Sequence, residues 1–216
     1  MLDTHTAVWN WGDGSTSAGT VSETNGSGSI SGSHAYSKPG VYKLTLTVTD
    51  KDGASAQTIF ESVLVYNPNG GSATGSGWIN SPAGAFIANP SLKGKAPFDF
   101  DVKYKRGASI PTGHVNFKLP SNALDFHSTG LDWMIINTKP GLLCWWFDQC
   151  SSTIQIKGTG TTKAGGNYQF MVWATDNHPD TLRIKIWSVN SAGVETVLYD
   201  NLSQQPIGGG NIDVAR

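Results

Sequence analysis

The chain has 216 residues, with 15 basic and 16 acidic side chains and a formal net charge of −1. This length suits one large domain or two small ones, and either arrangement can bury a core. The balanced charge argues against a nucleic-acid partner, since binding to nucleic acid depends on clustered Lys and Arg. No apolar run reaches the roughly 18 residues that predict a membrane span.

The composition also bears on the compartment. Residues 1–6 (MLDTHT) contain neither the basic nor the apolar region of a signal peptide, so these residues do not predict one. Twenty-six glycines, a charged fraction of 14% and two cysteines are typical of extracellular β-proteins. We therefore expect a secreted or cell-surface protein.

Alternating apolar and polar residues predict strands along the whole chain. In residues 41–48 (VYKLTLTV) the alternation places Tyr42, Leu44, Leu46 and Val48 on one face of a half-buried strand. A Lys-Asp-Gly turn follows, and the next strand is expected over residues 57–65. Further short strands are expected at residues 98–104, 114–119, 133–136, 154–157, 168–173, 182–187 and 196–199. Short strands separated by Gly, Pro, Asn and Asp predict an all-β protein built of sandwiches or barrels.

One segment reads as a domain boundary. Residues 67–77 (NPNGGSATGSG) contain no large apolar side chain and are rich in Gly, Ser and Asn. We therefore expect a first domain over residues 1–67, a linker over 68–76 and a second domain over 77–216.

The first domain carries a recognisable series of motifs. These are residues 9–14 (WNWGDG), 34–36 (HAY), 39–42 (PGVY) and 46–50 (LTVTD). The series resembles the PKD domain, a small immunoglobulin-like sandwich of surface and secreted proteins. Members of that family have about two more strands before the Trp-Gly-Asp-Gly strand, so the resemblance implies an incomplete sheet with an open edge. Its missing strands would come from upstream domains of the same polypeptide or from another chain.

The second domain resembles the C-terminal module that follows PKD domains in many large bacterial secreted or surface proteins. The resemblance covers nearly all of residues 77–216 and implies a larger, jelly-roll-like β-sandwich with no settled activity. The segments that carry it are residues 77–86, 103–107, 111–113, 124–128, 157–160, 166–168, 183–187, 199–201 and 207–210. Residues 138–152 depart from that family, because a short turn is replaced by a longer insertion.

The insertion contains the sequence CWWFDQC, with both cysteines of the chain, Cys144 and Cys150. With no third or fourth thiolate a zinc site is disfavoured, and we expect a disulfide, with free buried thiols as the alternative. Adjacent strand residues point to opposite faces, so Trp145 and Trp146 cannot both be buried. With Phe147, Asp148 and Gln149 they form a candidate platform for a polysaccharide. Alternatively, the segment folds back as a lid over its own domain.

Four aspartates are candidate calcium ligands: Asp50, Asp52, Asp176 and Asp180. Each pair also fits an ordinary turn, where Asp is favoured for its local hydrogen bonds. We favour the turn in both cases and retain calcium as a candidate cofactor.

No catalytic constellation stands out. The five histidines are scattered, no Gly-x-Ser-x-Gly elbow exists, and no two acids have a spacing that makes them converge. We therefore expect no enzyme, but a noncatalytic accessory region of a secreted or cell-surface bacterial protein, binding carbohydrate or mediating adhesion. The alternative is a structural spacer or C-terminal cap without a ligand of its own.

Overall fold

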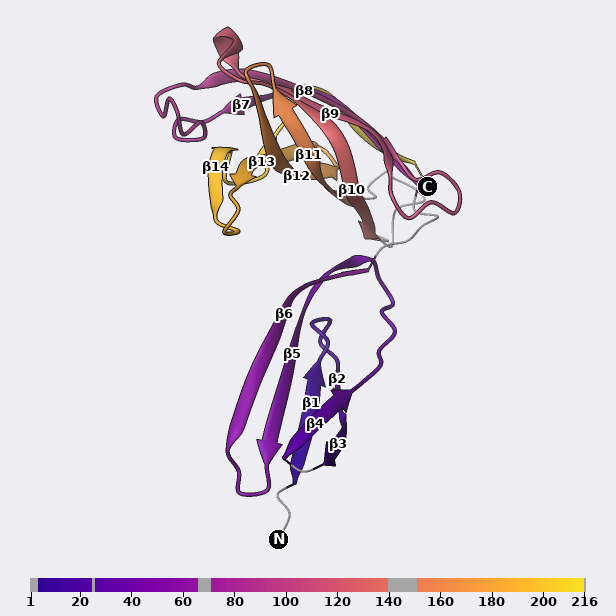
Figure 1. Ribbon diagram of the computed structural model, residues 1–216. Helices are drawn as coiled ribbons and strands as arrows, with labels where there is room; N and C mark the ends of the chain where they lie inside the picture. The colour runs from indigo at the N-terminus through magenta and orange to yellow at the C-terminus, as the bar shows by residue number, and fades with distance from the viewer. Residues whose placement is uncertain (1–3, 25, 66–70, 140–150, 216) are drawn as a thin grey trace. The chain divides into compact units, whose positions relative to one another are not determined.

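The computed structural model describes residues 4–24, 26–65, 71–139 and 151–215. The chain divides into two compact units, unit 1 over residues 1–65 and unit 2 over residues 66–216. Almost every described element of both is an antiparallel strand (Figure 1). The prediction of an all-β protein is confirmed.

Unit 1 consists of a four-stranded sheet in the order β2-β1-β5-β6 and a separate ribbon of β3 and β4. The strands are β1 (His5–Asn10), β2 (Thr16–Ala18), β3 (Thr20–Thr24), β4 (Ser27–Ser31), β5 (Gly40–Asp50) and β6 (Ser55–Val65).

The core of unit 1 lies on one face of the four-stranded sheet. Leu44 and Leu46 of β5 are buried, as the alternation predicted, together with Ala7 of β1 and Trp11. Tyr42 lies on the same face, and its hydroxyl donates to the Lys38 carbonyl at 2.8 Å. The described part of unit 1 buries no other large apolar side chain, so its core is thin.

Unit 2 is one ten-stranded antiparallel sheet. Its main path runs β14-β13-β12-β11-β10-β9-β8-β7-β16, and β15 pairs with β13. The elements are β7 (Ser72–Ser81), β8 (Gly94–Lys103), β9 (Thr112–Lys118), η1 (Pro120–Asn122), β10 (Asp125–Lys139), β11 (Ser151–Thr162), β12 (Gly165–Asp176), β13 (Thr181–Val189), β14 (Glu195–Asp200), β15 (Gln205–Pro206) and β16 (Gly209–Ala215).

This strand order corrects the expected jelly-roll arrangement. Strands β7 to β14 each pair with the next strand in sequence, so the sheet is a meander, and only β16 returns to pair with β7. Short connections explain the order, because antiparallel neighbours can be joined by a tight turn. Residues 163–164, for example, join β11 to β12.

The sheet of unit 2 curls, so that its two halves enclose one core (Figure 1). The rings of Phe117 in β9 and Tyr199 in β14 lie 4.7 Å apart between centroids, although these strands are far apart in the sheet order. Burial raises the pKa of Tyr199 to about 12, and its hydroxyl donates to Ser81 Oγ at 3.0 Å. A single curled sheet therefore provides both layers of the sandwich.

The segment expected as a linker differs from that expectation. Residues 72–76 lie in β7, paired on one side with β8 and on the other with β16. At Gly75 a side chain would collide with the ring of Phe100, and at Gly77 with the backbone of Gly209. The small residues here permit close packing within a sheet, which composition alone cannot distinguish from flexibility.

We expect Gly75→Ala to lower the free energy of unfolding of unit 2 by about 1–3 kcal/mol, because the Phe100 ring must move away from the added methyl group. Ser76→Ala, at the exposed neighbouring position, should change it by about 0.5 kcal/mol or less. Chemical denaturation midpoints of the two variants provide the comparison. Equal midpoints would show that this segment behaves as a linker.

Candidate functional site

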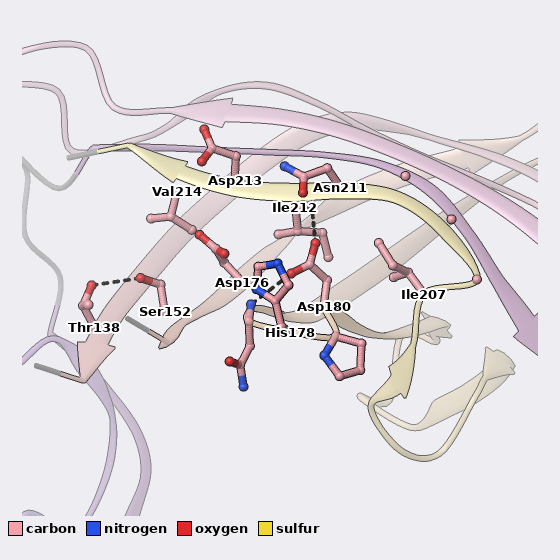
Figure 2. Close-up of a pocket in the computed structure, with 15 residues that line it drawn as sticks. Thr138, Ser152, Asp176, His178, Asp180, Ile207, Asn211, Ile212, Asp213 and Val214 are labelled. Atoms are coloured by element: carbon pink, nitrogen blue, oxygen red, sulfur yellow. Dashed lines mark hydrogen bonds between the residues drawn. The ribbon is translucent and has the colours of Figure 1, made fainter. Parts of the chain in front are cut away.

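A pocket of about 680 Å³ lies at one end of unit 2, where three parts of the chain meet (Figure 2). The ends of β10 and β11 contribute Thr138 and Ser152, whose hydroxyl oxygens lie 3.2 Å apart. The turn between β12 and β13 contributes residues 176–180, and the C-terminal segment contributes residues 207–214.

Asp180 holds two of these parts together. Its side chain is buried, with Oδ1 accepting from the N–H of Asn177 at 2.9 Å and Oδ2 from the N–H of Ile212 at 2.7 Å. Its carbonyl oxygen accepts from the N–H of Ile207 at 3.0 Å. A buried carboxylate is tolerated where hydrogen bonds satisfy it. Asp180 therefore fixes the β12–β13 turn and anchors β16 to it.

The remaining lining combines polar and acidic side chains with apolar residues, among them Pro179, Ile207 and Val214. Asp176, His178, Asn211 and Asp213 lie around the pocket (Figure 2), and no described lining residue is Lys or Arg. Asp213 and Asn211 are exposed on β16. The pocket thus offers carboxylate oxygens, amides and hydroxyls, which together accept and donate hydrogen bonds.

The structure brings Asp176 and Asp180 to the same pocket. Within the described residues, however, no group of three or more His, Cys, Asp or Glu side chains is arranged to hold a metal ion. One hydrogen bond of the Asp180 carboxylate, from Asn177 N–H, is local to the turn, and the other, from Ile212 N–H, ties the turn to β16. Calcium binding at this pair stays a prediction.

The expected glycan platform and disulfide lie outside the described residues. This applies to Cys144, Trp145, Trp146, Phe147, Asp148, Gln149 and Cys150. The described strands on either side, β10 and β11, pair up to Lys139 and Ser151. Thr138 and Ser152, next to these ends, line the pocket.

In unit 1 the turn after β1 is tightly organised. Trp11 N–H donates to the Ser15 carbonyl at 3.1 Å, and Gly12 and Gly14 adopt positive φ angles. Asp13 accepts from the Ser15 hydroxyl and contacts His34 Nε2 at 2.7 Å. These hydrogen bonds, that of Ser15 first, lower the pKa of Asp13 to about 2. The rings of Trp11 and His34 stack with centroids 5.1 Å apart, and Tyr36 donates to the Trp11 carbonyl.

Residues 1–65 match the family model of the PKD domain. PKD domains occur in extracellular proteins. No curated protein and no solved structure matches the chain. The resemblance of residues 77–216 to a C-terminal module therefore stays an expectation. Within the described ranges, no helix has the length and apolar character needed to cross a membrane.

In unit 1, Asp50 and Asp52 lie at the turn between β5 and β6. Asp50 Oδ1 accepts from the N–H groups of Asp52 and Ala54 at 2.7 and 3.0 Å, and Gly53 has a φ of 92°. Asp52 forms an ion pair with Lys51 at 2.7 Å. These contacts are those of turn residues, and a calcium role for the pair stays untested.

Three tryptophans of unit 2 directly adjoin core residues of their strands, Met134, Val172 and Ile186, and therefore point to the opposite face of the sheet. Trp133 and Trp173 are half-buried there, and Trp187 is 5% exposed. Arg183 lies over the ring of Trp173 at 4.6 Å, and Lys185 lies over that of Trp187 at 4.7 Å. The two cationic side chains therefore cover the rings of Trp173 and Trp187. Apolar residues occupy both faces of β12, so alternation alone does not predict to which face Trp173 points.

Proposed function

We propose that this chain is a noncatalytic accessory region of a secreted or cell-surface bacterial protein, and that the pocket of unit 2 binds carbohydrate. The match of residues 1–65 to the PKD domain supports an extracellular accessory or adhesive role. The observation that carries the carbohydrate proposal is the lining of the pocket, which combines carboxylates, amides and hydroxyls without Lys or Arg.

Sugar hydroxyls both donate and accept hydrogen bonds, so they need both kinds of group around them. Asp213 accepts from hydroxyl groups, while the amide of Asn211 donates and accepts on the same strand. The volume of about 680 Å³ falls within the roughly 300–1,000 Å³ of small-molecule sites. The Asp180 carboxylate accepts from the N–H groups of Asn177 and Ile212, and in this way it stabilises the walls of the pocket.

A panel of soluble oligosaccharides tests the proposal, with affinities measured by calorimetry on the intact chain. We expect Asp213→Asn to weaken binding of a responding oligosaccharide about 10-fold or more, because a neutral amide replaces the charged acceptor and one acceptor oxygen becomes a donor. Asp132→Asn is the matched control, since Asp132 is an exposed aspartate of β10 that does not line the pocket. Equal weakening by both variants, or no binding by the parent chain, would contradict the proposal.

The alternative function, a structural spacer or cap, is favoured by one observation. No described lining residue of the pocket is Trp, Tyr or Phe, and carbohydrate sites commonly stack a sugar face on an aromatic ring. Trp145→Ala and Trp146→Ala address this point in the same assay. If these residues form the platform, both variants weaken binding while the melting temperature stays nearly unchanged.

A further inference from the structure

Three carboxylates line the pocket of unit 2, those of Asp176, Asp180 and Asp213 (Figure 2). No described lining residue is Lys or Arg, and His178 is the only other titratable side chain among them. A cleft lined by charge of one sign concentrates ligands of the opposite sign. The charge of the lining therefore bears on which sugars the pocket binds.

Neither Asp180 nor Asp213 has a cationic partner among the described residues. Four other acidic side chains of unit 2 do have a cationic or titratable partner. These are Asp99 with His114, Asp125 with Lys118, Asp200 with Arg183 and Glu195 with Lys185, at N–O distances from 2.8 to 3.3 Å. Negative charge is thus balanced locally at these four places, whereas the described lining of the pocket leaves two carboxylates without a counter-charge.

Burial strengthens the attraction of Asp180 for a cation. The residue is 8% exposed, and both of its carboxylate oxygens accept backbone N–H hydrogen bonds. These bonds use only part of its capacity, since an ionised carboxylate has about four acceptor sites. Away from bulk water, its charge is screened less than that of an exposed side chain. The pocket therefore favours a ligand that brings a positive charge.

The same lining also holds groups that suit sugar hydroxyls. Thr138 and Ser152 contribute hydroxyls from the ends of β10 and β11, and Asn211 contributes an amide from β16. Hydroxyl and amide groups both donate and accept hydrogen bonds, whereas an ionised carboxylate only accepts them. An ammonium group only donates, so it is the complement of a carboxylate. A ligand that carries hydroxyls and an ammonium group therefore matches both parts of the lining.

We propose, on the basis of the carbohydrate function proposed above, that the pocket selects amino sugars, in which a free ammonium group replaces one hydroxyl of the ring. The ammonium group binds the Asp213 carboxylate through a charge-assisted hydrogen bond, which is stronger than a bond between neutral groups. The buried charge of Asp180 adds to the attraction, and the remaining sugar hydroxyls bind the hydroxyl and amide groups of the lining. N-acetylation of the sugar removes its charge and with it the preference.

Three soluble tetrasaccharides with the same linkage test the preference, one built of glucosamine, one of N-acetylglucosamine and one of glucose. Calorimetry measures their affinities for the intact chain, with a chelator present so that no divalent cation competes for the carboxylates. We expect the glucosamine tetramer to bind about 10-fold or more tightly than either of the other two. Added salt should reduce this ratio of affinities, because it screens the charges.

Asp213→Asn should reduce the same ratio about 5-fold or more, because a neutral amide replaces the carboxylate that binds the ammonium group. Asp132→Asn is the matched control, since Asp132 is exposed, forms no ion pair with a described residue and does not line the pocket. The control should keep the ratio of the parent chain. Both aspartates are exposed, so neither substitution should disturb folding.

Equal or tighter binding of a neutral tetramer would overturn the preference and leave the carbohydrate function in place, as would a ratio that Asp213→Asn does not change. Tetralysine provides a cation that is not a sugar. If it binds as tightly as the glucosamine tetramer, the pocket recognises positive charge alone and the preference for amino sugars is wrong. Absence of binding by all three tetrasaccharides would contradict the carbohydrate function itself, and the preference with it.

Discussion

Asp180→Ala is expected to lower the free energy of unfolding of unit 2 by about 3 kcal/mol or more. The substitution removes a carboxylate that accepts from the N–H groups of Asn177 and Ile212 in a buried setting. A hydrogen bond to a charged group contributes about 1.5–3 kcal/mol, and a buried donor left without a partner adds its desolvation cost. Chemical denaturation measures the loss. Hydrogen exchange should also rise at residues 209–215, since β16 loses its anchor.

Two variants sharpen this test. Asp180→Asn keeps one acceptor oxygen and loses the other, so its effect should fall between those of the parent chain and Asp180→Ala. Asp213→Ala removes an exposed carboxylate from the same pocket and should change stability by about 0.5 kcal/mol or less. If Asp180→Ala resembled Asp213→Ala, the anchoring role of Asp180 would be wrong.

The second large effect concerns the unequal cores of the two units. Unit 1 buries only Ala7, Trp11, Leu44 and Leu46 among its described apolar residues, whereas unit 2 buries a large continuous cluster. Small domains gain less from burial. Calorimetry should therefore show two transitions, with unit 1 unfolding first. Their enthalpies should scale with length, at about 45 kcal/mol for unit 1 and about 105 kcal/mol for unit 2 near 60 °C.

Core variants assign the two transitions. Leu44→Ala should destabilise unit 1 by about 2–5 kcal/mol and leave the second transition in place, while Ile156→Ala should lower only the second. A single transition that both variants shift together would show that the units unfold as one, contrary to this account.

Alternation predicted the strands well, because in a half-buried strand apolar residues of the buried face alternate with polar residues of the exposed face. Leu44 and Leu46 show this in β5. The sandwich of unit 2 was also expected, but its strand order was not, since pairing depends on which connections stay short. Gly75 was misassigned to a linker for a related reason, because only the structure shows the ring of Phe100 that packs against it.

The candidate site was predictable only in part. Asp176 and Asp180 were singled out because they are close in sequence, and they do line the pocket. Asn211 and Asp213 were not singled out from the sequence. They line the pocket because β16 returns to pair with β7, more than a hundred residues earlier in the chain. No local pattern carries that information. The only local patterns at the pocket were the turn with Asp176 and Asp180 and the glycines at 208–210, at the start of β16. Neither pattern indicates that these two segments meet.

The most direct test of carbohydrate binding by the pocket is a nuclear magnetic resonance titration of the isotope-labelled intact chain with an oligosaccharide that binds. The account predicts saturable shifts of the amides of Asn177, Asn211 and Asp213, with those of unit 1 unchanged. Saturable shifts confined to other surfaces, with these three amides unmoved, would contradict it.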